Sequence, residues 1–377
     1  MDSPHFFPYY YVLYNLFFWL LAYFYTRKNG RMLLLSGTNG KFSSSLLFLI
    51  ILAYSVFTFF GGDTFTYKEI IEEGFSENYF YNANQVEPLY LYIATLVGGN
   101  YYMWKLVIYS FAILLTFQTY KELNINNSIT WYVFVILIMT SYGSSRAILA
   151  YAMFSLGLAL VTSKKRKKKL LSLILFVGTI MAHTSMIPIV LLSLLGRWRL
   201  TKKKIVCLLA LFPFIVLGIN VLLSFLGAND SFLDTYIGYK FGVYTDEEGS
   251  AGTNLQALSL IGLSILEYIV LIPVLYIALR SEVKNTLDNR ISLFTRVSFY
   301  IVYFSLVLRF MDLNNTEYLF KRYFDMFPFV IIPTLSYLYQ KRQVNRKLLK
   351  YIDGTSLARC VYWFVMMMYI QWANGAV

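Results

Sequence analysis

Residues 163–204 read SKKRKKKLLSLILFVGTIMAHTSMIPIVLLSLLGRWRLTKKK. Within them lies a long apolar run, 170–195, whose single ionisable side chain is His183, and a basic cluster flanks this run on each side. One helix over the run would span about 39 Å, enough to cross a hydrocarbon core of about 30 Å. Its two flanks would then lie on opposite faces of a membrane, although Lys and Arg collect on one face. The pattern therefore favours a re-entrant or bent helical hairpin that turns at His183 inside the membrane, with both ends cytoplasmic.

The whole chain has the composition of a polytopic membrane protein. Of its 377 residues, 58% are hydrophobic and 19% aromatic, and no stretch has the polar surface of a soluble domain. A net charge of +13 would suggest a nucleic-acid partner in a soluble chain, but 24 of the 33 basic residues lie in five loops. The charge asymmetry places these loops in the cytoplasm and the acidic loops outside, and no nucleic acid is expected. The basic loops are 27–41, 163–169, 197–204, 280–296 and 340–351, and the acidic loops are 61–87 and 227–254.

The apolar runs predict an all-α fold with about ten transmembrane helices and the hairpin 170–195. Residues 1–377 would form a single polytopic membrane domain, with both termini outside. The first run has no basic n-region and no cleavage site, so we expect a retained span rather than a signal peptide. The predicted crossings are 6–26, 44–60, 101–117, 128–143, 146–162, 205–226, 255–279, 292–310, 319–338 and 355–372.

Neither a metal site nor a nucleotide site is indicated by the sequence. Cys207 and Cys360 lie in or beside apolar runs and lack CxxC or Cys/His spacing, so we expect no disulfide and no metal. No GxGxxG or Walker A motif occurs. We therefore expect no cofactor and no use of ATP.

Two carboxylates mark the first long outer loop. Asp63 lies where the chain leaves the second crossing, and Glu87 precedes Pro88, which suits the first turn of a helix. Each carboxylate could serve only to cap a helix. They could instead be reactive groups at the outer face. The aromatic rings of Tyr67 and Tyr90 lie beside them in the sequence, although most tyrosines of this chain fit an interfacial belt.

Three arginines lie on the outer side, where basic residues are otherwise scarce. Arg146 opens the fifth crossing, and Arg309 and Arg322 flank the late outer loop. Snorkelling to the interface, or ion pairing with an acid such as Asp325, is the ordinary explanation. A guanidinium also binds phosphate oxygens through two parallel hydrogen bonds and keeps its charge. Three such groups together favour a diphosphate ligand.

His183 has two interpretations. A lone histidine in an apolar segment is usually a hydrogen-bonded packing residue, and Thr184 or Ser185 could supply the hydrogen bond. Its place at a predicted break inside the membrane makes a functional role equally reasonable, since histidine can act as a general base near neutral pH. Asp63, Glu87 and His183 are thus the candidates for a catalytic base, with Asp63 and His183 favoured.

Five short motifs occur in a fixed order along the chain. They are Gly62-Asp63-x-x-x-Tyr67, Glu87-Pro88-Leu89-Tyr90, Arg146-Ala147, His183-Thr184-Ser185 and Lys321-Arg322-Tyr323. In this order, from about residue 55 to about residue 335, they resemble the EpsG family, which is related to the Wzy-type polymerases of bacterial surface polysaccharides. Members of that family often have Gln at the position of Ala147, so a role tied to that Gln is not expected here.

The resemblance implies a glycosyltransferase, a polysaccharide polymerase of the bacterial cytoplasmic (inner) membrane with its active site on the outer, periplasmic side. It would move a growing glycan from undecaprenyl diphosphate to the non-reducing end of a new lipid-linked repeat unit. Its transmembrane helices could have a GT-C-like arrangement. Its partners would be this lipid-linked donor and acceptor, membrane lipid and a chain-length regulator. Outer loops 61–100 and 227–254 would help to cover the site. Arg146, Arg309 and Arg322 would bind diphosphate, Asp63, Glu87 or His183 would take the acceptor proton, and Tyr67, Tyr90 and Tyr323 would bind glycan.

Other functions share parts of this pattern. A multispanning glycosyltransferase that uses polyprenyl-phosphate sugars would have the same outer site and an acidic motif in the first outer loop. An O-antigen ligase would use the same donor but usually has a larger late outer loop. A membrane O-acyltransferase would account for a buried histidine but not for the arginines. A flippase or transporter should have broken helices in corresponding halves, and the sequence predicts one broken segment.

Overall fold

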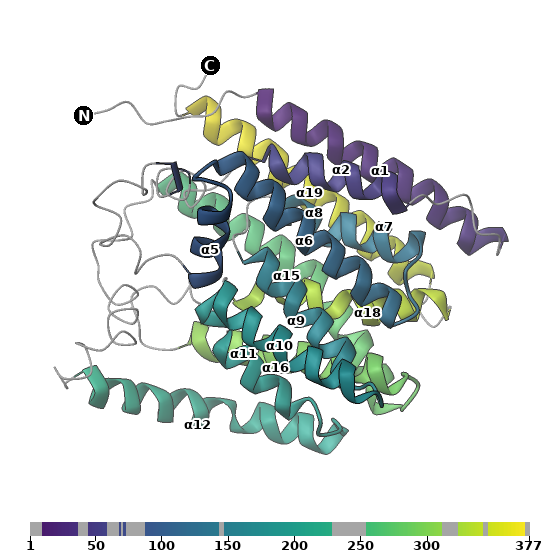
Figure 1. Ribbon diagram of the computed structural model, residues 1–377. Helices are drawn as coiled ribbons and strands as arrows, with labels where there is room; N and C mark the ends of the chain where they lie inside the picture. The colour runs from purple at the N-terminus through teal and green to yellow at the C-terminus, as the bar shows by residue number, and fades with distance from the viewer. Residues whose placement is uncertain are drawn as a thin grey trace.

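The computed structural model describes residues 10–36, 44–58, 68, 71–72, 87–142, 147–227, 254–310, 323–341 and 346–373. These residues form helices and turns, and no strand occurs among them. The fold is therefore all-α, as the sequence predicts. Most helices lie side by side in one bundle, and α12 runs along its edge (Figure 1).

Each apolar run predicted as a crossing overlaps a helix. The N-terminal part contains α1 (Tyr10–Ser36), α2 (Ser44–Val56), α5 (Pro88–Leu96), α6 (Tyr101–Glu122), α7 (Ser128–Leu137), α8 (Met139–Tyr142) and α9 (Ile148–Val161). The C-terminal part contains α10 (Arg166–Ala182), the 3₁₀ helix η1 (Thr184–Met186), α11 (Ile187–Leu195), α12 (Lys202–Gly227), α15 (Asn254–Val283), α16 (Asn289–Arg309), α18 (Phe327–Gln340) and α19 (Arg346–Ala373).

Helix length alone does not establish the predicted number of membrane crossings. Within the described residues, two helices are long and apolar enough to cross a membrane, Lys202–Val221 of α12 and Asn289–Arg309 of α16. Other predicted crossings form shorter helices, such as α2 with 13 residues and α7 with 10. The apolar run 128–143 indicates where a helix forms, but it does not reveal the break in the backbone between α7 and α8.

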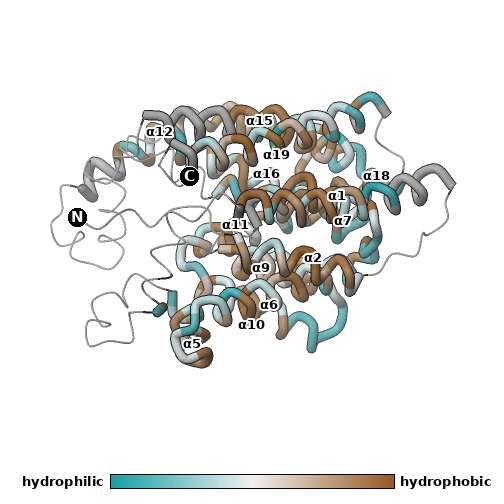
Figure 2. Tube along the Cα trace, turned by 90° about the horizontal axis from the view of Figure 1, so that it is seen from above, coloured by the Kyte–Doolittle hydropathy of each residue, from teal (hydrophilic) through white to brown (hydrophobic). Residues whose placement is uncertain are grey.

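The centre of the bundle is built from apolar helices that are buried on almost every side. α18 packs against α7, α9 and α16, and nearly all side chains of α9 and α18 are buried. Hydrophobic residues also cover helices at the periphery, such as α1 and α15, while polar residues gather toward helix ends (Figure 2). Large apolar side chains are exposed in a number that a water-facing surface seldom carries. On α10 and α12 these are Leu170, Leu173, Ile174, Val177, Val206, Leu209, Phe214, Leu217 and Val221.

The predicted break at His183 is present. α10 ends at Ala182, His183 has an extended backbone (φ −161°, ψ 104°), and η1 and α11 follow. Pro188 lies in the first turn of α11, where a missing N–H leaves no helical hydrogen bond unmade. The run 170–195 is therefore two helical arms rather than one long helix.

Both arms of this broken segment end close to the N-terminal half of α16, the first through Glu122 at the end of α6. At the start of α10, Lys168 pairs with Glu122, whose backbone carbonyl accepts a hydrogen bond from Arg290 at 2.9 Å. At the end of α11, the carbonyl of Gly196 accepts a hydrogen bond from Arg296 at 3.3 Å. Residues 166–195 thus form a hairpin whose two ends lie at the same end of the bundle.

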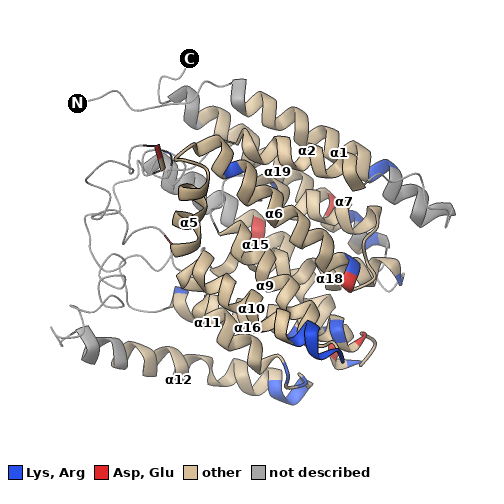
Figure 3. Ribbon diagram, in the orientation of Figure 1, with Lys and Arg blue, Asp and Glu red and all other residues tan. Residues whose placement is uncertain are grey.

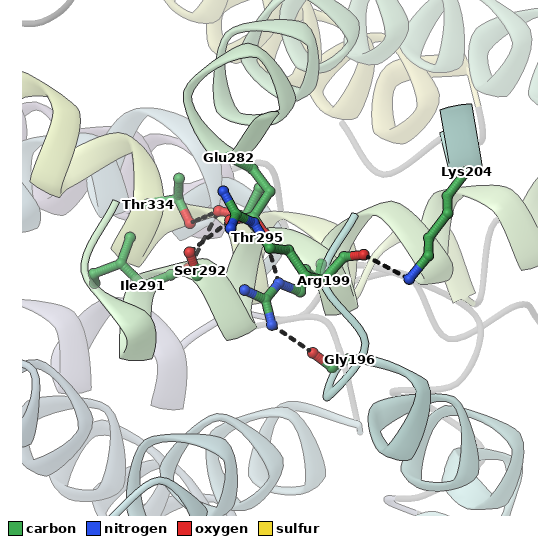
Figure 4. Close-up of polar contacts among 9 residues, drawn as sticks. Gly196, Arg199, Lys204, Glu282, Ile291, Ser292, Thr295 and Thr334 are labelled. Carbon is green, nitrogen blue, oxygen red and sulfur yellow. Dashed lines mark hydrogen bonds and ion pairs between the residues drawn. The ribbon is translucent and has the colours of Figure 1, made fainter. Parts of the chain in front are cut away.

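Charged and polar side chains hold this end of the bundle together. Glu282 of α15 accepts a hydrogen bond from Arg296 Nε at 2.6 Å and another from the hydroxyl of Ser292, and it is buried (Figure 4). Lys and Arg of the described residues gather mainly here, around the starts of α10, α12 and α16 (Figure 3). We call this the basic end of the bundle.

Gly196 allows the hairpin to sit directly on α16. A Cβ atom at this position would lie 2.7 Å from Cγ2 of Val297 and 2.9 Å from Cδ1 of Leu293. We therefore predict that Gly196→Ala lowers stability by about 1–3 kcal/mol, because the added methyl group overpacks this contact. Thermal unfolding in detergent measures the change.

Gly218→Ala in α12 is the matched control. A Cβ there would meet nothing within 4 Å, so the substitution should leave stability unchanged or raise it by up to about 1 kcal/mol. Equal melting temperatures for wild type and Gly196→Ala would contradict the close packing of the hairpin on α16.

Candidate functional site

A buried contact between Glu87 and His183 forms the centre of the candidate site. Nδ1 of His183 lies 2.7 Å from Oε1 of Glu87, and the two side chains are 3% and 8% exposed. The residues are separated by 96 positions in sequence. The contact joins the start of α5 to the turn of the hairpin, and we refer to it as the Glu87–His183 pair.

Glu87 is placed by the start of α5. It occupies the N-cap position with an extended backbone (φ −67°, ψ 143°), and Pro88 opens the helix as the sequence predicts. Its side chain makes no capping hydrogen bond. Capping, one of the two interpretations of Glu87, is therefore wrong, because the carboxylate turns away from the helix and contacts the imidazole.

His183 is placed by the break in the hairpin. Its backbone N–H donates to the carbonyl of Thr179 at 3.0 Å, and its carbonyl accepts from the N–H of Met186 at 2.9 Å. The backbone is therefore hydrogen-bonded on both sides of the break. The side-chain contact goes to Glu87, and not to Thr184 or Ser185, the two neighbours that sequence reasoning offered.

The geometry of the pair suits a general base. An ionised carboxylate can only accept hydrogen bonds, so Nδ1 of His183 carries the hydrogen when Glu87 is charged. Nε2 is then the basic nitrogen of the neutral ring, and the carboxylate stabilises the imidazolium that forms when Nε2 takes a proton. A carboxylate that orients a histidine in this way is a recurrent arrangement in acid–base catalysis.

Tyr90 and Tyr323 are packing residues in this structure. Tyr90 is fully buried, its ring lies edge-on to that of Trp104 at 5.6 Å, and its carbonyl accepts a hydrogen bond from the Trp104 indole at 3.1 Å. Tyr323 is also buried and packs edge-on against Phe304 at 5.2 Å. A buried ring offers no face to a sugar, so the predicted glycan-binding role of these two residues disagrees with their burial.

Sequence reasoning missed Lys105, a buried lysine on α6. Its ammonium group donates to the backbone carbonyl of Thr58, just after α2, and lies over the rings of Tyr101 and Tyr109 at 5.8 and 5.6 Å. Thr58 itself donates to Asn15 of α1 at 2.9 Å. Lys105 therefore ties α6 to the end of α2, from which the chain continues toward Asp63.

Sequence reasoning also missed a buried ion pair in the middle of the bundle. Nη2 of Arg359 lies 2.7 Å from Oε1 of Glu267, and both residues are buried. Each is the single charged residue of its predicted crossing, as Lys105 is of the crossing 101–117. A lone charge within an apolar run is a signal of function or pairing that could have identified all three.

The remaining candidates are placed as follows. Arg309 is the last residue of α16 and is half-exposed, where its charge also complements the helix dipole. Asp63, Tyr67, Arg146 and Arg322 lie outside the described residues, as do residues 228–253 of the predicted loop 227–254. Among the candidates that are described, the structure brings Glu87 and His183 together. No group of three or more potential metal ligands occurs within the described residues.

The protein is thus an all-α bundle with a broken apolar hairpin and a buried Glu–His pair. The chain matches the EpsG family over residues 41–376. It therefore belongs to the EpsG family, which is associated with exopolysaccharide biosynthesis. Comparison with curated proteins and comparison with solved structures gave no match.

A double-mutant cycle can measure the Glu87–His183 pair without any assay of activity. Glu87→Ala and His183→Ala should each destabilise the protein by about 3–5 kcal/mol, because each removes the hydrogen bond between two buried polar side chains. The double variant should cost less than the sum of the two, with a coupling of about 0.5–3 kcal/mol. Thermal or denaturant unfolding in detergent gives these values.

Thr95→Ala on α5 is the control, since its hydroxyl bonds only to the carbonyl of Leu91 at an exposed site. It should combine additively with His183→Ala. Strict additivity between Glu87→Ala and His183→Ala would show that the contact contributes nothing to folding.

Proposed function

We propose that this protein is a polysaccharide polymerase of the bacterial cytoplasmic membrane. It transfers a growing glycan from undecaprenyl diphosphate to the non-reducing end of a new lipid-linked repeat unit at the outer face. The observation that carries this proposal is the buried Glu87–His183 pair at the turn of the hairpin, in a chain of the EpsG family.

Charge and exposure support a membrane location with the basic end in the cytoplasm. Large apolar side chains are exposed on α10 and α12. In both helices the first turn, just before these side chains, carries exposed Lys and Arg residues. A basic rim beside an apolar belt is typical of the cytoplasmic side of a membrane protein. Trp198 is exposed between Arg197 and Arg199 in this rim, as expected of an aromatic residue at the interface.

Helix lengths support a site near the opposite, outer end. α10 has 17 residues, so His183 lies about 25 Å along this arm from the basic end at 1.5 Å per residue. α16 also starts at the basic end, and its 21 residues carry Arg309 about 30 Å along the bundle. The imidazole and this arginine are thus both displaced from the basic end toward the side where the lipid-linked substrates carry their sugars.

His183 is the proposed general base and Glu87 the residue that orients it. Nε2 takes the proton from the acceptor hydroxyl, and the hydroxyl oxygen attacks the anomeric carbon of the donor. The bond between that carbon and the diphosphate oxygen breaks, and undecaprenyl diphosphate leaves with the electron pair. Asp63 remains a second candidate for the base.

Arg146, Arg309 and Arg322 are the proposed diphosphate-binding residues. Guanidinium groups stabilise the negative charge that develops on the leaving group, and they keep their own charge throughout. The donor is already activated as a diphosphate, so the reaction needs no nucleotide. Tyr67 is the remaining proposed glycan contact from the sequence motifs.

A second broken helix bears on the transporter alternative. The backbone is interrupted at Ile138 between α7 and α8, in addition to the break at His183. Both breaks lie in the N-terminal half of the chain, whereas transporters with inverted repeats place them in corresponding halves. The described chain therefore favours the enzyme over the flippase.

The direct test supplies purified lipid-linked repeat units to the protein in liposomes. Polymerase activity gives a ladder of chain lengths, a sugar-phosphate-dependent glycosyltransferase gives single additions, and a flippase moves substrate without making a bond. We predict that His183→Gln and Glu87→Gln each lower the rate by about 10²–10⁴-fold, the usual contribution of a general base. The amount of protein in the membrane should not change.

Thr95→Ala is again the control and should give a wild-type ladder, because its hydroxyl bonds only within α5. A full rate in His183→Gln would remove His183 from the reaction and leave Asp63 as the base. Transport of substrate without a ladder in the wild type would refute the polymerase.

Cysteine labelling tests the membrane orientation of the hairpin. Arg166→Cys and Lys202→Cys, each made with Cys207→Ala, place single exposed thiols at the start of α10 and the start of α12. We predict that a membrane-impermeant maleimide reaches both positions from the cytoplasmic side and neither from outside, because both ends of the hairpin lie at the basic end. Labelling of the two positions from opposite sides would contradict the re-entrant topology.

A further inference from the structure

Two clusters of Lys and Arg lie at the two ends of the hairpin. Between Glu122 and Asp230 the chain carries twelve Lys and Arg residues and no carboxylate side chain, and eleven of the twelve lie at 164–169 and 197–204. The first cluster runs into the first turn of α10 and the second into the first turn of α12. Both ends of the hairpin lie at the basic end, so the fold brings the two clusters to the same end of the bundle (Figure 3). We call the two clusters together the basic rim.

Carboxylates of the neighbouring helices α6, α15 and α16 do not neutralise the basic rim. Glu122 pairs with Lys168, and Glu282 is buried and binds Arg296. Asp288 caps the start of α16 by accepting a hydrogen bond from the backbone at 2.9 Å. The other ten cations of the rim are exposed and form no ion pair with any described residue. They are Lys164, Lys165, Arg166, Lys167, Lys169, Arg197, Arg199, Lys202, Lys203 and Lys204.

The cations of the rim do not stabilise the helices that carry them. The dipole of a helix favours acidic side chains in its first turn and disfavours basic ones. α10 has basic residues at 166–169 and α12 at 202–204, and neither helix has an acidic residue in its first turn. The rim is therefore electrostatically unfavourable for both helices unless negative charge from outside the chain lies beside it.

Exposed apolar side chains begin within one turn of the rim. Leu170 directly follows the first cluster, Leu194 precedes the second, and Val206 follows the second, and all three are exposed. Trp198 lies inside the second cluster and is 64% exposed. A ligand that covers the whole surface must therefore combine negative charge with an apolar part. A phospholipid has both, whereas free phosphate or nucleic acid would leave the apolar side chains in water.

We propose that the basic rim binds the headgroups of anionic phospholipids in the cytoplasmic leaflet. Guanidinium and ammonium groups donate hydrogen bonds to the phosphate oxygens, and Trp198 lies at the boundary between headgroups and acyl chains. Basic clusters directly beside a membrane-embedded helix are attracted to anionic lipid in this way. The bound headgroups hold both ends of the hairpin at one depth. This inference goes beyond the proposed reaction and does not depend on it.

Membrane topology alone would also place basic residues at this end of the bundle. A topological signal acts while the chain inserts, and it predicts no preference among lipids in the finished protein. A lipid-binding surface predicts a lasting preference for anionic headgroups near Trp198. The two explanations therefore differ in a measurement on the purified full-length chain.

The experiment measures quenching of Trp198 fluorescence by brominated lipids in nanodiscs. The host lipid is phosphatidylcholine, and the brominated lipid is either phosphatidylglycerol or phosphatidylcholine at the same mole fraction, with bromine near the headgroup end of the acyl chains. Trp19, Trp104, Trp131 and Trp363 are buried. Trp198→Phe supplies the background from every other tryptophan.

Brominated phosphatidylglycerol should quench Trp198 more strongly than brominated phosphatidylcholine does. The relative affinity should be about fivefold or more, which corresponds to about 1 kcal/mol, the contribution of a single Lys or Arg near an anionic surface. The preference should decrease as salt is added, because exposed charges are screened. Inorganic phosphate at matched ionic strength should not compete more strongly than chloride.

Arg197→Gln/Arg199→Gln should lose most of this preference, because it removes the two charges beside Trp198. The control is Lys28→Gln/Lys350→Gln, which removes the same charge from exposed positions on α1 and α19, outside the rim but in or beside loops predicted to be cytoplasmic. The control should keep the wild-type preference. Both variants are compared as single folded species with the same melting temperature check.

Equal quenching by the two brominated lipids in the wild type would overturn the proposal. An equal loss of preference in the control pair would also overturn it, because the effect would then follow from net charge rather than from the rim. Displacement by inorganic phosphate alone would show adventitious anion binding only. A protein that prefers phosphatidylglycerol but makes no glycan ladder would refute the polymerase and leave the lipid-binding rim intact.

Discussion

The contact between Glu87 and His183 sets the arrangement of the half of the bundle away from the basic end. It joins two segments that are 96 residues apart. The contact forms because α5 starts beside the point where α10 is interrupted at His183. Burying a carboxylate or an imidazole is costly, and the contact between the two side chains offsets part of that cost. α5 and the turn of the hairpin are consequently held together by a polar contact within an apolar protein.

Interrupted helices recur in this fold, and each one links distant parts of the chain. At His183 the backbone is satisfied locally by Thr179 and Met186, which leaves the side chain to reach α5. At Ile138 the released carbonyls are satisfied by donors from α1, α2 and α19. A regular helix satisfies its own backbone and needs no such partners. The breaks therefore add specific hydrogen bonds between helices to the packing contacts that hold the bundle together.

Much of this fold follows from the apolar runs. The length of each hydrophobic run predicts the helix that overlaps it. The lone polar residue His183 within its run predicts the break, and Pro88 predicts the start of α5. The break at Ile138 could not be predicted, since residues 128–142 contain neither Gly nor Pro and the donors that stabilise it lie far away in sequence. The contact of His183 with Glu87 could not be predicted from the sequence either, because 96 positions separate the two residues. Both Glu87 and His183 were candidates for a base, but only tertiary structure shows that one orients the other.

The first arm of the hairpin is short, and this has a consequence for the surrounding lipid. Four of the 17 residues of α10 are basic, so its apolar part has 13 residues and a length of about 20 Å, against about 30 Å for a hydrocarbon core. A bilayer beside this arm would become thinner, because lipid chains shorten at small cost to cover a short hydrophobic surface. Such local thinning would bring the lipid headgroups of the outer leaflet closer to the imidazole of His183. The sugar-bearing ends of two carrier lipids would then arrive at the same depth as the residue proposed to act on them.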